Sequence, residues 1–209
     1  MPDAAEHPFA ALVRERGGAA LGEPAAAAGF EPVAAGFVAV LARDEETLPP
    51  VARVGPWQAA GWLLLADGGV GVGDAEAASA QALAEALAET DLPSYLLTSG
   101  RVGGGVDEPR SREIPAALVA RVLDAALAGT VDWEVDPDFG YELPMDLPEL
   151  GPDDRRILVP RFLYARTDRV YDYAEMVPRL RRQRSARLGA MVGLPSAIGD
   201  AFDAPARRR

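Results

Sequence analysis

The hydrophobic pattern of the chain changes repeatedly between short apolar runs and longer amphipathic segments. The apolar run at residues 37–41 predicts one buried strand, and the segment Ser-Tyr-Leu-Leu-Thr at residues 94–98 predicts a second. In residues 75–89, Leu83 and Leu87 share one helical face while acidic residues occupy the other, which predicts an amphipathic helix. Further helices are expected at residues 7–16, 58–65, 116–127 and 168–187. This alternation predicts an α/β fold, a single domain in which a mixed sheet carries packed helices.

Glycine and proline mark the ends of these elements. Gly17 and Gly18 end the first predicted helix, and Pro178 is expected to break or kink the last one. Three segments are expected to lack regular structure: 19–35, 130–160 and a mobile tail at 189–209. We therefore divide the chain into an N-terminal helix with a low-complexity lead-in at residues 1–36, a domain at 37–188, and a basic mobile tail at 189–209.

The composition excludes many kinds of active site. All 21 basic side chains are arginine, and the sequence contains no lysine, no cysteine and one histidine, His7. Without cysteine there is no thiolate nucleophile and no cysteine-ligated metal. Without lysine there is no Schiff base and no standard phosphate-loop lysine. Because chain termini are usually exposed, we expect His7 at the surface.

The charge is unevenly distributed along the chain. Residues 1–154 carry 8 arginines and 27 acidic residues, whereas residues 155–209 carry 13 arginines and 5 acidic residues. An acidic body argues against nucleic-acid binding, since phosphate attraction needs a dominant positive surface. The arginine-rich C-terminal segment suits contact with an acidic protein partner. No apolar stretch approaches the ~18 residues of a membrane span, and no signal pattern is seen, so we expect a cytoplasmic protein.

A glycine spacing typical of a nucleotide phosphate loop runs from Gly68 to Gly73 and precedes a predicted helix. The positions that need lysine and serine or threonine hold Asp74 and Ala75 instead, and an aspartate there repels phosphate. We therefore interpret this segment as a glycine-rich turn rather than a nucleotide site.

Two further clusters each allow a functional and a structural interpretation. Carboxylates alternate around Trp133, at Asp132, Glu134, Asp136 and Asp138. They suit acid–base chemistry or metal binding, but the same pattern is typical of a solvated loop, which we favour. Arginines and aromatic residues are interleaved at Arg161, Phe162, Tyr164, Arg166, Arg169, Tyr171 and Tyr173. A stacking surface for a phosphate ligand is one interpretation; we favour aromatic rings packed inward beside solvated arginines.

Several segments, in order, resemble the ATP-dependent phosphoenolpyruvate carboxykinases. Residues 48–54 (Leu-Pro-Pro-Val-Ala-Arg-Val) are similar to the family's Leu-Pro-Pro-Val-x-[Lys/Arg]-Leu stretch, and residues 95–104 are similar to its Tyr/Trp-Leu-Val-Asn-Thr-Gly-Trp-x-Gly-Gly strand and loop. Residues 136–144 (Asp-Pro-Asp-Phe-Gly-Tyr-Glu-Leu-Pro) resemble its Asp-Pro-x-Phe-Gly-Phe-Glu-Val-Pro segment. Residues 158–174 resemble its Leu-Asn-Pro-Arg and Tyr-Asp-x-x-Ala tail. The resemblance covers about residues 37–188 and implies the fold of the family's C-terminal lobe, truncated and degenerate.

The family places ATP and Mn²⁺ or Mg²⁺ with a lysine-bearing phosphate loop, a following Asp-Asp motif, and a further lysine and histidine. This chain has neither the loop nor the motif, and no segment supplies the lysine and histidine. The resemblance implies that part of a nucleotide-base site remains, formed by Arg112 with Gly103, Gly104 and Gly105. Arg110 is a competing register for the arginine.

These observations predict a carboxykinase-like protein that is non-catalytic and binds nucleotide weakly at most. ATP with Mn²⁺ or Mg²⁺ would be its cofactors only if the family's site is retained. Two alternatives stay open. One is carboxykinase-type lyase activity in a complex with a second chain that supplies the phosphate loop. The other is a small interaction protein that docks through its arginine-rich C-terminal segment.

Overall fold

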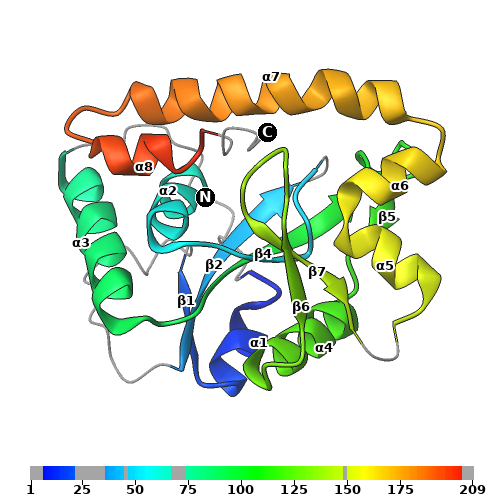
Figure 1. Ribbon diagram of the computed structural model, residues 1–209, viewed down its shortest axis with the longest axis horizontal. Coiled ribbons are helices and arrows are strands. Elements are labelled where there is room, and N and C mark those ends of the chain that lie inside the picture. The colour runs from blue at the N-terminus through cyan, green and yellow to red at the C-terminus, as the bar shows by residue number, and fades with distance from the viewer. Residues whose placement is uncertain (1–6, 22–35, 45–46, 67–73, 148–149, 204–209) are drawn as a thin grey trace, which may run out of the picture.

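A mixed β-sheet lies at the centre of the computed structural model (Figure 1), which describes residues 7–21, 36–44, 47–66, 74–147 and 150–203. Within these ranges the strands are β1 (Gly18–Leu21), β2 (Phe37–Asp44), β3 (Val51–Arg53), β4 (Ser94–Val102), β5 (Arg112–Glu113), β6 (Asp132–Val135) and β7 (Glu142–Asp146). Their order across the sheet is β1-β2-β4-β3-β7-β6, and β5 pairs with β4. Strands β1, β2 and β4 are parallel, and the other described pairings are antiparallel. The predicted α/β fold with a mixed sheet is confirmed.

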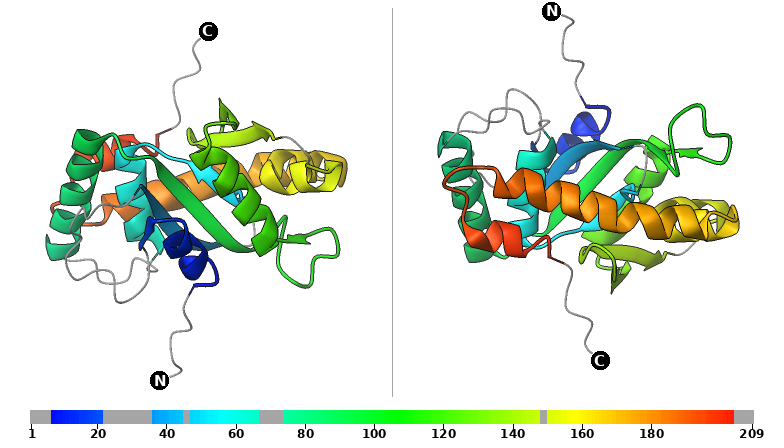
Figure 2. Two further views of the ribbon diagram at one scale, coloured as in Figure 1. Left: turned by 90° about the horizontal axis from the view of Figure 1, so that it is seen from below. Right: turned by 90° about the horizontal axis from the view of Figure 1, so that it is seen from above.

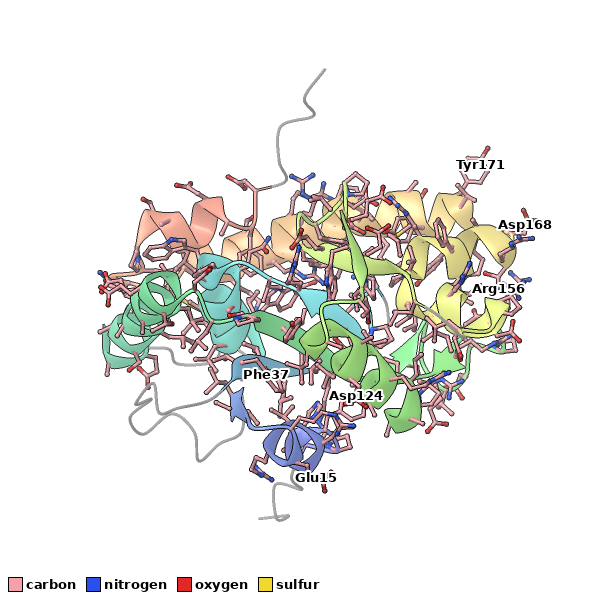
Figure 3. All side chains as sticks on the ribbon, turned by 60° about the horizontal axis from the view of Figure 1, so that its bottom comes forward. Glu15, Phe37, Asp124, Arg156, Asp168 and Tyr171 are labelled. Atoms are coloured by element: carbon pink, nitrogen blue, oxygen red, sulfur yellow. The ribbon has the colours of Figure 1, made fainter. Side chains whose placement is uncertain are left out.

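Helices cover both faces of this sheet. They are α1 (Ala10–Glu15), α2 (Pro56–Ala66), α3 (Asp74–Thr90), α4 (Ala116–Leu127), α5 (Pro152–Leu158), α6 (Pro160–Arg166), α7 (Val170–Gly189) and α8 (Ser196–Asp200). Figure 2 shows α1 and α4 on one side and α7 on the other. Arg16, the residue after α1, forms an ion pair with Asp124 of α4, with Nε and Oδ1 2.6 Å apart. Figure 3 labels Glu15, the last residue of α1, and Asp124 on α4. No helix of the described ranges is long and apolar enough to cross a membrane.

The two apolar runs of the sequence form the centre of the sheet. Val38 to Asp44 of β2 lie in parallel register with Ser94 to Gly100 of β4. Side chains on both faces of these strands are buried, as expected for parallel strands between two helical layers. That double burial explains why neither strand shows the alternation of apolar and polar residues that is typical of a strand with one exposed face.

Strand β1 is the first difference from the sequence expectation. Its four residues include three that were expected to belong to a loop at 19–35; residues 22–35 lie outside the described part. The pairing partner of β1 is β2, with Gly18 opposite Phe37. A Cβ atom at Gly18 would overlap the buried Phe37 ring. Small side chains therefore serve close packing here, and this reason is not visible in a local pattern.

The segment 130–160 is also more regular than expected. It contains the β6–β7 hairpin, helix α5 and the start of α6. The hairpin turn is closed by a 2.7 Å hydrogen bond from the Asp136 N–H to the Tyr141 carbonyl oxygen, and Gly140 adopts a φ of 76°. Pro152 and Pro160 stand in the first turns of α5 and α6, where a missing N–H costs nothing.

The C-terminal elements differ from the sequence expectation in two ways. Helix α7 continues through Pro178 instead of breaking there. Pro178 and Ala174 are both exposed, so water can bind the Ala174 carbonyl that the proline leaves without a donor. Within the segment expected to be a mobile tail, α8 packs with Ile198 fully buried, and the Phe202 ring lies 5.4 Å from that of Trp62. Residues 204–209 lie outside the described part.

Candidate functional site

The hairpin between β4 and β5 brings the predicted nucleotide-base residues together. Arg112 pairs with Val102, so the arginine stands directly across from the strand end that leads into the glycine loop, residues 103–105. Gly103 and Gly104 have φ values of 91° and 129°, which favour glycine. The N–H of Ile114 donates to the Gly100 carbonyl at 3.1 Å and holds the start of α4 beside the same loop.

Protein side chains fill the space that these glycines leave. A Cβ atom at Gly103 would lie 2.8 Å from Leu163 Cδ2, and one at Gly104 would lie 2.9 Å from Glu108 Cβ. Leu163 belongs to α6 and is buried. The close approach that the glycines permit is therefore made by α6 and by the loop itself, which gives these glycines a packing role.

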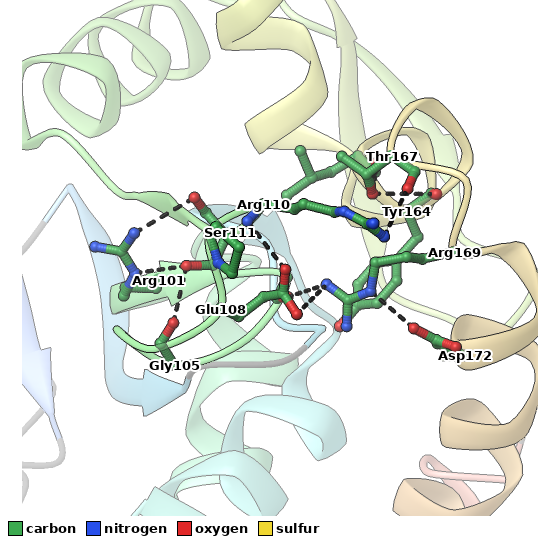
Figure 4. Close-up of polar contacts among 12 residues, drawn as sticks. Arg101, Gly105, Glu108, Arg110, Ser111, Tyr164, Thr167, Arg169 and Asp172 are labelled. Carbon is green, nitrogen blue, oxygen red and sulfur yellow. Dashed lines mark hydrogen bonds and ion pairs between the residues drawn. The ribbon is translucent and has the colours of Figure 1, made fainter.

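Arg169 fastens the loop to the start of α7 (Figure 4). Its Nη1 donates to the Gly103 carbonyl at 2.6 Å and its Nε to Asp172 Oδ2 at 2.8 Å. Its Cζ lies 4.7 Å from the centre of the Tyr164 ring. Burial lowers the pKa of Arg169, but the Asp172 hydrogen bond and the Glu108 charge outweigh it, so that pKa is raised. Arg169 is therefore charged and held in place.

The arginine and aromatic cluster thus follows neither sequence interpretation completely. Tyr164 is buried as we favoured, but Phe162 and Tyr171 are 41% and 85% exposed. The Arg169 side chain, expected to be solvated, is only 15% exposed. Arg169 is shielded from solvent because it binds the Gly103 carbonyl, a contact between residues 66 positions apart in the chain.

Ser111 and Arg101 hold the other side of the loop (Figure 4). The Ser111 hydroxyl donates to the Gly105 carbonyl at 2.9 Å, and Arg101 Nε donates to that hydroxyl at 2.8 Å. Arg112 is exposed, and its Nη1 donates to the Ser111 carbonyl at 2.9 Å. Its guanidinium is thus folded against its own loop. Arg110, the competing register, donates instead to the Thr167 carbonyl at 3.2 Å.

His7 is buried, contrary to the surface position expected for it. Its Nδ1 accepts the N–H of Phe9 at 3.3 Å, so Nε2 carries the proton and lies 3.0 Å from the Ala42 carbonyl oxygen. The Ser99 hydroxyl is 2.9 Å from the same Nε2, which in this tautomer cannot take a proton from it. Helix α1 and the ends of β2 and β4 surround the His7 ring. Its position near the N-terminus therefore did not predict its burial.

The four carboxylates around Trp133 do not converge. Asp132 and Glu134 are exposed on β6, whereas Asp136 is buried. Asp136 Oδ1 accepts the N–H groups of Asp138 and Phe139 at 2.7 and 2.9 Å. Its task is to form the hairpin turn. Among the described residues no group of three or more carboxylate or histidine side chains could hold a metal ion.

Replacing Asp136 tests this role. Burial raises the pKa of Asp136 despite its two backbone hydrogen bonds, so the contribution of Asp136 to wild-type stability falls as the pH rises above its unfolded-state pKa of about 3.9. Asp136→Asn keeps an acceptor oxygen without the buried charge, and we expect unfolding in urea to show equal or greater stability at pH 7, with a smaller difference at pH 4. Asp136→Ala loses both hydrogen bonds and about 1–2 kcal/mol. Equal losses in both variants at pH 7 would contradict this explanation.

The fold and the loop define an α/β protein with a mixed sheet and a glycine-rich hairpin at the start of a helix. Curated proteins that match the chain are all named phosphoenolpyruvate carboxykinase (ATP). The chain therefore contains a phosphoenolpyruvate carboxykinase (ATP)-like segment, as its motifs predict. No family model matches the sequence.

The similarity to these enzymes is partial. The enzyme from Parvibaculum lavamentivorans is 30% identical over 165 residues, which are 68% of this chain and 30% of that protein. The enzyme from Novosphingobium aromaticivorans is 27% identical over 159 residues, 64% of this chain and 29% of that protein. The enzyme from Methylorubrum extorquens is 36% identical over 69 residues, 32% of this chain and 12% of that protein. The chain spans about three tenths of the length of the first two relatives.

Proposed function

We propose that this chain is a non-catalytic relative of the carboxykinases that binds nucleotide weakly. The observation that supports the proposal is the lack of side chains that could bind phosphate or metal in the way the family does. The sequence has no lysine, and both ring nitrogens of His7 form contacts inside the fold. Phosphoryl transfer depends on placing a metal, a lysine and backbone amides around the phosphates. The proposal is also supported by the described residues, among which no group of three or more His, Asp or Glu side chains is placed to hold a metal ion.

The nucleotide would bind at the accessible side of residues 103–105, with its base against Arg112, because Leu163 already fills the space beside the buried Gly103. The arginine is exposed, and a planar guanidinium both stacks and donates hydrogen bonds. The start of α4 adds backbone N–H donors. The exposed side chains of Asp107 and Glu113 lie in the same hairpin and repel a polyphosphate. We expect a dissociation constant for ATP no tighter than about 0.1 mM, equivalent to roughly −5 to −6 kcal/mol.

Calorimetric titration with ATP, with and without Mn²⁺, tests this site. Arg112→Ala is expected to weaken ATP binding about 10-fold, since it removes a group worth roughly 1.4 kcal/mol. Arg110→Ala is the matched control, because that arginine faces Thr167, and its binding should equal that of the wild type. Equal binding by wild type and Arg112→Ala would refute the role of Arg112. No ATP binding by the wild type would refute nucleotide binding altogether.

A second candidate function is docking of a partner protein at the α6–α7 end of the molecule. Exposed apolar side chains gather there, at Phe162, Val170 and Tyr171. Figure 3 shows Tyr171 and Arg156 at the same end. An apolar groove of about 390 Å³ beside Phe162 is lined by Arg155, Arg156 and Arg166. An apolar patch rimmed by positive charge is typical of an interface with an acidic protein.

The partner in this second candidate would be the chain that supplies the missing phosphate loop. Mixing the protein with a phosphate-loop-bearing fragment should then produce phosphoenolpyruvate that neither component forms alone. The double variant Phe162→Ala, Tyr171→Ala should abolish this gain. A gain that survives in the double variant would place the interface elsewhere.

A further inference from the structure

One outer edge of the sheet is formed by β6. Within the part of the chain that the structure describes, β7 is the only strand that pairs with it, and no strand lies on its other side. Asp132, Glu134 and Val135 are exposed there, and Trp133 is half-buried. Both views of Figure 2 show the β6–β7 hairpin at the periphery of the molecule. An edge strand in this position presents backbone N–H and C=O groups to which another strand can pair.

The two faces of β6 differ in chemistry. The register shift in the β6–β7 pair places its extra residue on β7, so the side chains of β6 keep their alternation. Asp132 and Glu134 therefore share one face, and Trp133 and Val135 share the other. The centre of the Trp133 ring lies 6.0 Å from that of Tyr95, and Val135 is 50% exposed. The edge is acidic on one face and apolar on the other.

The acidic residues of β6 select the charge of a partner strand. Glu142 of β7 lies opposite Val135, and its Oε1 accepts a hydrogen bond from Arg53 Nη2 at 2.7 Å. Among the described residues, by contrast, no arginine forms an ion pair with Asp132 or Glu134. A basic side chain directly across from either residue would form a cross-strand ion pair, which stabilises strand pairing by roughly 0.2–1 kcal/mol.

A second copy of this chain fits the edge poorly. An antiparallel register that pairs the apolar residues of two β6 strands also places their acidic residues opposite one another, and such like-charge pairs are destabilising. The alternative register places Trp133 and Val135 opposite the charged residues. A basic partner avoids both conflicts. Residues 1–154, with 27 acidic residues and 8 arginines, also attract such a partner over a longer range.

We propose that the outer edge of β6 binds an extended segment of a partner protein by strand addition, and that basic and apolar residues alternate in this segment. Main-chain hydrogen bonds to β6 provide the affinity, and the alternating side chains provide the specificity. The basic residues face Asp132 and Glu134, and the apolar residues extend the surface of Trp133 and Val135. This surface is separate from the α6–α7 end and from the nucleotide site at residues 103–105.

Calorimetric titration of the whole chain with a short synthetic peptide of alternating arginine and valine tests the proposal. We expect saturable submillimolar binding of this peptide. A block peptide of the same composition, with every arginine before every valine, should bind about 10-fold more weakly, because it cannot present one residue type to each face. Glu134→Arg should weaken binding of the alternating peptide about 5-fold. Glu89→Arg, at an exposed position of α3, makes the same change in net charge and should stay within twofold of the wild type.

Four outcomes would overturn the proposal. One is the absence of saturable binding of the alternating peptide by the wild type. Another is equal binding of the block peptide, which would indicate general attraction to an acidic protein. Equal weakening by Glu134→Arg and Glu89→Arg would indicate an effect of net charge alone. Self-association of the wild type in sedimentation, if Glu134→Arg alters it, would assign the edge to a second copy. Matching thermal unfolding curves confirm that each variant folds.

Discussion

Phe139→Ala is expected to lower the free energy of unfolding by about 3–5 kcal/mol, the cost of removing a buried aromatic side chain. Phe139 is 7% exposed, and its ring stacks on that of Tyr141 with the centres 5.7 Å apart. The Arg184 guanidinium covers the ring as well. The loss therefore combines lost burial with a cavity beneath α7. Urea unfolding followed by circular dichroism measures it.

Phe162→Ala is the matched control, because that ring is 41% exposed and should cost less than about 1 kcal/mol. The two variants remove the same atoms, so their difference isolates the effect of position. If Phe139→Ala keeps its melting temperature within a degree or two, residues 136–144 are not part of the packed core. The resemblance to the carboxykinases would then lose its strongest anchor.

Gly103→Ala is expected to cost about 2–5 kcal/mol. A φ of 91° strains a residue with a Cβ atom by roughly 1–2 kcal/mol, and overpacking against the buried Leu163 adds about 1–3 kcal/mol. Thermal unfolding measures the total. Gly55→Ala is the control, since a Cβ there meets no atom within 4 Å.

A third variant separates the two causes at Gly103. Adding Leu163→Ala removes the side chain that the new Cβ would meet, so the cost of Gly103→Ala should become smaller in that background. The part that remains reports the backbone strain. If Gly103→Ala and Gly55→Ala have the same small effect, the loop is not held against α6 in the way described.

The sequence predicted those elements whose pattern is local. Residues 37–41 are apolar throughout, residues 94–98 are apolar except for Ser94 and Thr98 at the two ends, and the two segments form the cores of β2 and β4. The helix expected from Ala116 to Leu127 has those bounds, because Pro115 and Gly129 mark both ends. The sequence did not predict β1 or the packing of α8, because each depends on a distant partner. Ala19 and Ala20 do not by themselves indicate a strand; pairing with β2 makes them one.

The candidate site was likewise predictable only where the pattern is local, and not where it depends on distant residues. The strand before the glycines was predicted from its pattern, and the resemblance to the carboxykinases linked Arg112 to residues 103–105, but the sequence analysis did not predict the β4–β5 hairpin that joins them. The residues that fix the loop, Leu163 and Arg169, lie far along the chain and carry no motif. The burial of His7 was missed for a related reason, since its partners Ala42 and Ser99 are 35 and 92 positions away. In the sequence, Arg169 could be recognised as a candidate site residue only from the arginine and aromatic residues that are interleaved around it.

The central claim, that this chain does not catalyse carboxykinase chemistry, is tested most directly by an assay of phosphoenolpyruvate formation. Purified protein would be incubated with oxaloacetate, ATP and Mn²⁺, with a full-length carboxykinase as the positive control. Because the sequence has no lysine to contact the phosphates and its sole histidine is buried in protein contacts, we expect no product above the protein-free blank. Turnover above that blank, proportional to the amount of this protein added, would contradict the account.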